Sequence, residues 1–113
     1  MSAAARAAMN QTTAGGDAIY ISAITLVEVL YLVEKGRLRP DDRRVILEAI
    51  ANRDSPARLA PLDRDVVDSL EHVSREDVPD MPDRIIAATA VALQVPLISR
   101  DRKIRASRVQ TIW

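Results

Sequence analysis

Residues 80–93, DMPDRIIAATAVAL, join a helix start to a long apolar helix. Asp80 is suited to cap this helix, and Pro82 is favoured in a first helical turn. An acid at position 83 is stabilised by the positive end of the helix dipole. The carboxylate of Asp83 is also a hard oxygen donor of the kind that Mg²⁺ or Mn²⁺ prefers. Local spacing alone favours a purely structural acid, so the other acids of the chain decide whether Asp83 is a metal ligand.

Helix and strand patterns alternate around this segment. Short β-branched or apolar runs predict strands, and apolar periodicity or alanine content predicts helices. The predicted strands are residues 17–22, 57–62, 95–99 and 109–113, and the predicted helices are 2–11, 25–35, 40–52, 63–73 and 80–94. Helices between strands indicate crossover connections and a parallel sheet that is covered on both faces, which is an α/β fold. The 113 residues show no repeat and no internal boundary, so we expect one domain over residues 1–113.

The same patterns predict which side chains form the core. Helix 25–35 is apolar on nearly every face, and such a helix is expected to be buried. Gly36 follows it at the position of a C-terminal glycine cap. The segment SREDVPDMP, residues 74–82, is expected to be a polar loop. The residues expected to face inward from the other two central helices are Val45, Ile46, Ala49 and Ile50, and Val66, Val67, Leu70 and Val73.

Composition excludes several classes of protein. The chain has 16 basic and 16 acidic residues, so any signal for nucleic-acid or membrane binding has to be local. It has no cysteine, which excludes disulfides and thiolate metal sites and is compatible with a reducing compartment. No apolar run is long enough to span a bilayer, and the alanine-rich N-terminus is a poor secretion signal. We therefore expect a cytoplasmic protein with no membrane partner.

Three acids follow predicted strands or open predicted helices. Ligand sites of open parallel sheets lie beyond the carboxyl ends of the strands, and Glu28, Asp83 and Asp101 are all predicted to lie there. Each acid also has a structural interpretation. TLVE, residues 25–28, fits a capping box in which Glu28 reaches back to the helix start. Asp83 fits a first helical turn, and Asp101 fits a turn. Together the three acids suit an oxygen-bound divalent cation better than each does alone.

Basic residues surround the last of these acids. RDRK, residues 100–103, is followed closely by another arginine, and the cluster predicts a local basic edge that binds phosphates. A solvated loop is the alternative. The candidate phosphate-binding residues, which would contact RNA if the substrate is RNA, are Arg100, Arg102, Lys103 and Arg105. Arg84 is expected to form an ion pair on the helix surface, and His72, the only histidine, is expected on a polar face.

Two segments carry a family resemblance. ISAITLVEVLYLVEKGRL, residues 21–38, and MPDRIIAATAVALQVPLISRDRKI, residues 81–104, resemble the PIN-domain family, in particular VapC-type ribonuclease toxins of type II toxin–antitoxin systems. The resemblance implies a PIN-like parallel sheet sandwiched by helices and hydrolysis of RNA phosphodiester bonds with Mg²⁺ or Mn²⁺. It implies that Glu28, Asp83 and Asp101 are catalytic metal ligands, with Ser99 and Asp80 in support. It also implies a homodimer and a cognate VapB-like antitoxin.

The sequence departs from the family pattern at its N-terminus. Family members begin with an apolar strand that ends in the first acid, and this strand has no counterpart before residue 2. Asp17 precedes its strand and would lie at the opposite sheet end, so it does not replace that acid. A different start site, a boundary of the sequenced piece and a true truncation each account for this difference. We expect a domain truncated at its N-terminus, with weak metal affinity and little activity.

Two other functions remain open on the sequence alone. A non-catalytic PIN remnant would keep its helical surface for dimerisation or antitoxin binding, and the lack of the first acid favours it. A DNA- or RNA-processing nuclease outside toxin systems is the third hypothesis. The retained acids Glu28, Asp83 and Asp101 favour an enzyme, because an idle site would tolerate their loss.

Overall fold

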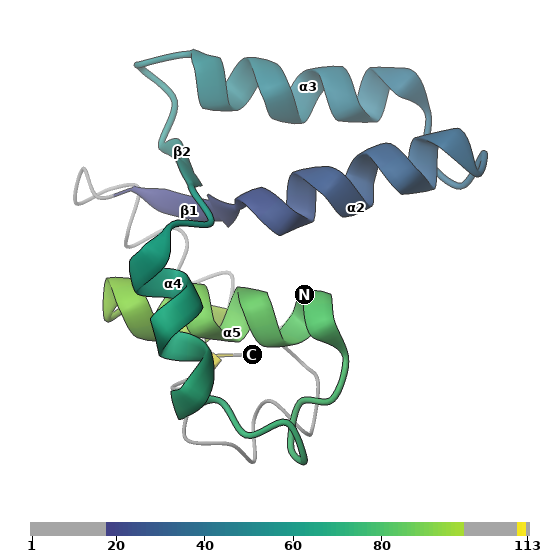
Figure 1. Cartoon of the computed structure of the whole chain (residues 1–113). Helices are drawn as coiled ribbons and strands as arrows, with labels where there is room; N and C mark the ends of the chain where they lie inside the picture. The colour runs from purple at the N-terminus through teal and green to yellow at the C-terminus, as the bar shows by residue number, and fades with distance from the viewer. Residues whose placement is uncertain (1–17, 99–110, 113) are drawn as a thin grey trace.

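The computed structural model describes residues 18–98 and 111–112, and Figure 1 shows their arrangement. The described elements are β1 (Ile19–Ser22), α2 (Ala23–Glu34), α3 (Pro40–Ala51), β2 (Ala57–Ala60), α4 (Arg64–Ser69), the 3₁₀ helix η1 (Leu70–His72), α5 (Met81–Leu93), β3 (Leu97–Ile98) and β4 (Thr111–Ile112). The predicted α/β class is confirmed. The helix expected at residues 2–11 lies outside the described residues.

The described strands form two parallel pairs. β1 pairs with β2 in a register that joins Ile19 to Ala57 and Ser22 to Ala60, and β3 pairs with β4. The helices α2 and α3 form the crossover between β1 and β2, which confirms the parallel arrangement inferred from the sequence. We expected one sheet covered on both faces. Across residues 18–98 and 111–112 the two pairs are instead separate, with no strand joining them.

The helices α2 and α3 form an antiparallel hairpin (Figure 1). Its turn is set by Gly36, whose φ of +75° lies in the left-handed region. The amide of Gly36 donates to the carbonyl of Val33 at 3.0 Å, and that of Arg37 donates to Leu32 at 2.8 Å. These bonds satisfy the last carbonyls of α2 as a Schellman cap, so the predicted glycine cap is confirmed. A Cβ at position 36 would meet nothing within 4 Å. Alanine there would therefore cost about 1 kcal/mol through backbone conformation alone.

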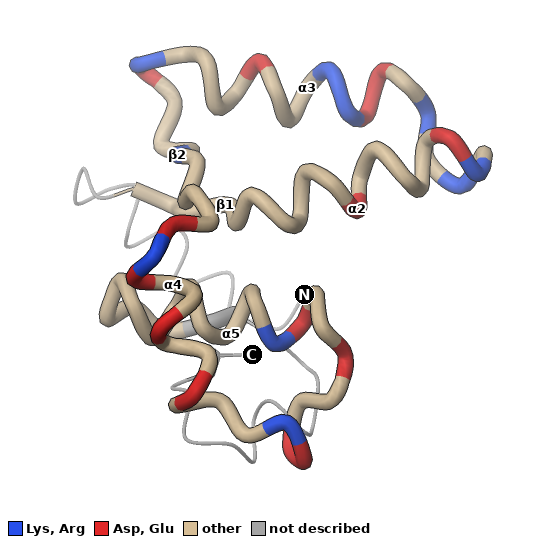
Figure 2. Tube along the Cα trace, viewed as in Figure 1, with Lys and Arg blue, Asp and Glu red and all other residues tan. Residues whose placement is uncertain are grey.

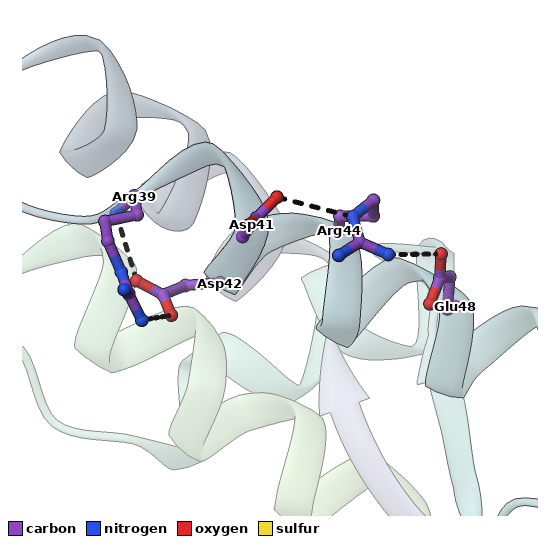
Figure 3. A network of polar contacts seen from close by, with 5 residues as sticks. All are labelled: Arg39, Asp41, Asp42, Arg44 and Glu48. Carbon is purple, nitrogen blue, oxygen red and sulfur yellow. Dashed lines mark hydrogen bonds and ion pairs between the residues drawn. The ribbon is translucent and has the colours of Figure 1, made fainter.

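The start of α3 is held by charged side chains on its surface (Figure 3). A carboxylate oxygen of Asp42 accepts from the backbone amide of Arg39 at 3.0 Å, which lowers the pKa of Asp42. Further along the helix, Arg44 lies 3.5 Å from Asp41 and 3.0 Å from Glu48. Figure 2 shows these acidic and basic residues alternating along α3. The acidic and basic side chains on the surface of α3 therefore balance one another's charge.

The core lies between α4, η1, the connection 73–80 and α5. Val73 and Val78 are its most buried larger side chains, with exposures of 1% and 2%. From α5 it receives Ile85 and three small residues, Ala87, Ala88 and Ala90. Alanines on this face leave α4 room to pack closely against α5. The apolar face predicted for residues 80–94 is thus the main contact surface of the domain.

Several side chains predicted to be buried are exposed. Helix α2 was expected to be buried, yet Val29 is its only buried residue, and Val27 and Tyr31 are 48% and 58% exposed. On α3, Val45 is exposed, and on α4 Val67 is 52% exposed. These predictions were wrong because apolar content does not specify which neighbouring element covers a given face. Val78, in the expected polar loop, is the converse case.

Val78→Ala and Val67→Ala test whether Val78 is buried and Val67 is exposed. Val78→Ala should lower the free energy of unfolding by about 2 kcal/mol, because it removes buried methyl groups and leaves a cavity. Val67→Ala should change it by less than about 0.5 kcal/mol, because the site is exposed on a helix. Urea unfolding followed by circular dichroism measures both. Equal losses in the two variants would contradict the burial described for the 73–80 connection.

Candidate functional site

Strand β1 runs directly into α2, and Ser22 joins them. The hydroxyl oxygen of Ser22 accepts from the amide of Ile24 at 3.3 Å, so Ser22 caps the helix. The structural alternative for Glu28, a capping box with Thr25, is therefore wrong, because the helix already begins at Ala23. Glu28 lies in the second turn and takes no part in the cap.

Asp80 and Asp83, whose roles the sequence left open, have different positions at the start of α5. Asp80 precedes the helix, and its carboxylate accepts from the amide of Asp83 at 3.3 Å. The carbonyl of Asp80 accepts a hydrogen bond from the amide of Arg84 at 2.9 Å, and this bond closes the first turn of the helix. Asp80 is thus the N-cap, as expected. The capping of α5 does not require the carboxylate of Asp83.

Glu28 is electrostatically coupled to the start of α5. Its pKa is raised, first by partial burial and then by the negative charges of Asp83 and Asp80. This coupling arises because α2 packs against α5. The carboxylates of two helices that are far apart in sequence therefore act on one another. A bound cation would offset this repulsion, and carboxylates are the donors that Mg²⁺ and Mn²⁺ prefer.

The structure brings together part of the predicted ligand set. Within residues 18–98 and 111–112, no three acidic, histidine or cysteine side chains are arranged to hold a metal ion. The third predicted ligand, Asp101, lies outside the described residues, as do Ser99 and the predicted RNA-binding residues Arg100, Arg102, Lys103 and Arg105. The donor chemistry of Glu28 and Asp83 fits a divalent cation, and Asp101 stays a prediction. His72 is exposed, as expected.

Arg84 has a role that the sequence did not reveal. Its Nε donates to the carbonyl of Val73 at 2.9 Å, and its Nη2 donates to the carbonyl of Leu70 at 3.0 Å. The expected surface ion pair is therefore wrong. Leu70 is the first residue of η1 and Val73 follows its last residue, so Arg84 links both ends of this short helix to α5. Sequence spacing contained no signal for this contact, because it depends on how η1 meets α5.

Comparison with known families identifies a domain that covers most of the chain. The sequence model of the PIN domain matches residues 2–109. The chain belongs to the PIN domain family. No significant match was found among curated proteins or among solved structures.

Membership confirms the family resemblance at its general level. The PIN domain is generally a nuclease fold, and its members commonly depend on divalent metals. The acids Glu28 and Asp83 of this PIN domain lie on α2 and α5, whose packing couples them. Among the described residues, no helix is long and apolar enough to cross a membrane.

Glu28→Gln tests the coupling between α2 and α5. Because the folded state raises the pKa of Glu28, ionisation of Glu28 opposes folding. The resulting loss of stability is absent below the ordinary pKa of 4.5 and develops as the pH rises through the raised pKa. In metal-free buffer at neutral pH, Glu28→Gln should therefore stabilise the protein by about 0.5 kcal/mol, a value reduced for solvent screening. Urea unfolding should show this gain disappearing under acidic conditions.

Glu34→Gln is the control, because Glu34 is exposed at the last residue of α2. It should leave the pH dependence of unfolding close to that of the parent. An unchanged or lower stability of Glu28→Gln at neutral pH would contradict the electrostatic coupling.

Proposed function

We propose that this PIN domain is a Mg²⁺/Mn²⁺-dependent endoribonuclease of the VapC type, which hydrolyses RNA phosphodiester bonds. The observation that supports it most strongly is the coupling of Glu28 on α2 to Asp83 on α5. Both helices are capped by other residues, Ser22 and Asp80, so neither acid is explained by helix capping. An apolar replacement would remove the repulsion between them, and the retained acids therefore favour a site that uses their charge.

The proposed roles follow from the chemistry of the side chains. Glu28, Asp83 and Asp101 would hold the cation, and one of these carboxylates would accept a proton from the attacking water. When bound, the cation polarises the phosphoryl oxygens and lowers the pKa of a bound water. Ser99 would support the site next to Asp101. The basic residues that would bind phosphates along the RNA are Arg100, Arg102, Lys103 and Arg105.

The proposed partners are a second copy of the chain and a VapB-like antitoxin. Exposed apolar side chains on α2 support a protein-binding surface, among them Val27, Leu30 and Tyr31. The same side chains support a second candidate, a non-catalytic PIN module that only dimerises or binds an antitoxin.

Asp83→Asn tests the proposed metal ligand. Mn²⁺ should raise the melting temperature of the parent chain by binding the folded state, and it should fail to do so in Asp83→Asn. Cleavage of single-stranded RNA should fall by at least about 100-fold, because a ligand is lost rather than one of its supporting contacts. Isothermal titration calorimetry with Mn²⁺ and a fluorogenic RNA assay measure the two effects. Circular dichroism should show that the variant remains folded.

Asp77→Asn is the matched control, because Asp77 is an exposed acid in the connection before α5. It should retain Mn²⁺ binding and cleavage. Equal cleavage by Asp83→Asn and the parent would exclude Asp83 as a ligand. A parent chain that binds neither Mn²⁺ nor RNA, yet forms a dimer in analytical ultracentrifugation, would favour the non-catalytic module. Parallel assays with DNA distinguish a ribonuclease from a DNA-processing nuclease.

A further inference from the structure

Arg84 links α5 to η1, the two helices on either side of the connection 73–80. Its guanidinium donates from Nε to the carbonyl of Val73 and from Nη2 to the carbonyl of Leu70, at 2.9 and 3.0 Å. The Leu70 carbonyl also accepts the amide of Val73 at 3.1 Å. One side chain from the first turn of α5 thus binds the carbonyl of the first residue of η1 and the carbonyl of the residue that follows η1. A cation is favoured at this position, because helix C-termini carry partial negative charge.

The contact holds one side of the first turn of α5 against η1. Successive residues of an α-helix are separated by about 100° around the axis. Because Arg84 is held against η1, the adjacent residue Asp83 lies about 100° away from it around the helix axis and faces a different neighbour. Helix α5 also packs against α2, which carries Glu28, and the negative charge of Asp83 is one cause of the raised pKa of Glu28. Contacts of α5 with both η1 and α2 agree with this arrangement.

We infer that Arg84 is a positioning residue, which holds the first turn of α5 so that Asp83 faces Glu28 in the proposed metal site. The inference rests on the proposed function, since it assigns Arg84 a task only if Asp83 binds a cation. Arg84 itself bonds to backbone carbonyls and not to a substrate. Its guanidinium has the planar fork needed to donate two bonds along one edge, which the single ammonium of lysine does not reproduce.

Electrostatics and positioning predict opposite effects on metal binding. Arg84 carries a positive charge next to a proposed cation ligand, so charge alone predicts that neutralising it would strengthen Mn²⁺ binding. If Arg84 positions Asp83, its loss should weaken Mn²⁺ binding. Contacts that orient metal ligands typically change metal affinity by about 10–100-fold when they are removed. Arg84→Lys keeps the charge and loses the fork, whereas Arg84→Gln loses both.

The test is Mn²⁺ titration of the full chain by calorimetry, with Arg84→Lys and Arg84→Gln. Both variants should bind Mn²⁺ about tenfold more weakly than the parent, or weaker still. Arg75→Lys, at an exposed arginine of the same connection, should bind like the parent. Gly36→Ala controls for stability, because it strains the distant turn of the α2–α3 hairpin. It should lower the melting temperature without changing Mn²⁺ affinity.

A measurement on the parent chain covers the case in which the Arg84 variants fail to fold. If the Arg84 contact favours the metal-bound state, binding of the metal must favour the contact by the same factor. Addition of Mg²⁺ should therefore slow the exchange of the Arg84 Nε proton with water, which nuclear magnetic resonance can follow. An exchange rate that does not respond to bound Mg²⁺ would overturn the inference.

The outcomes separate this inference from the proposed function. Parent-like Mn²⁺ affinity in Arg84→Lys, or stronger binding in Arg84→Gln, overturns the positioning role and leaves the metal site intact. A loss of affinity in Gly36→Ala equal to that in Arg84→Lys also overturns it, because general destabilisation would then explain both. A parent chain that binds no Mn²⁺ overturns the proposed function and this inference together.

Discussion

The packing of α5 against α4 and η1 is the contact on which the other features of this PIN domain depend. Ala87 and Ala88 are fully buried in it, and Val73 and Val78 fill the space beside them. Thr89 is also buried on this helix, and its hydroxyl donates to the carbonyl of Ile85 at 2.7 Å, which satisfies its polar group. Because α5 carries Asp83 at its start, the position of the candidate site follows from this core.

Signals carried by a few adjacent residues were the most reliable guide to the fold. Gly36 ends a helix because its own backbone adopts a positive φ, and Asp80 begins one because its side chain reaches the next turn. Such contacts need no distant partner. The start of α2 is the exception, because both Ser22 and Thr25 are good caps and the strand before them selects the earlier one.

Burial was less predictable than secondary structure. Val67 and Val78 have the same side chain, and the helical pattern favours burial of the first. Their exposures are reversed in the structure because they depend on where the connection 73–80 folds. In the candidate site, too, the sequence indicated some features and the packing determined others. The sequence indicated Glu28 and Asp83 as acids of interest, whereas their mutual effect and the contacts of Arg84 come from the packing of helices.

The limited burial of the α2–α3 hairpin has a consequence for cooperativity. Val29 is the only buried residue of α2, and α3 has none. Elements with few buried contacts open at lower free energy than the core, so the hairpin is expected to be a separate unit in native-state hydrogen exchange. Glu28 belongs to that weaker unit and Asp83 to the stronger one. Any ligand shared by the two acids would therefore join two regions that otherwise open independently, and it would raise the protection of the hairpin towards that of the core.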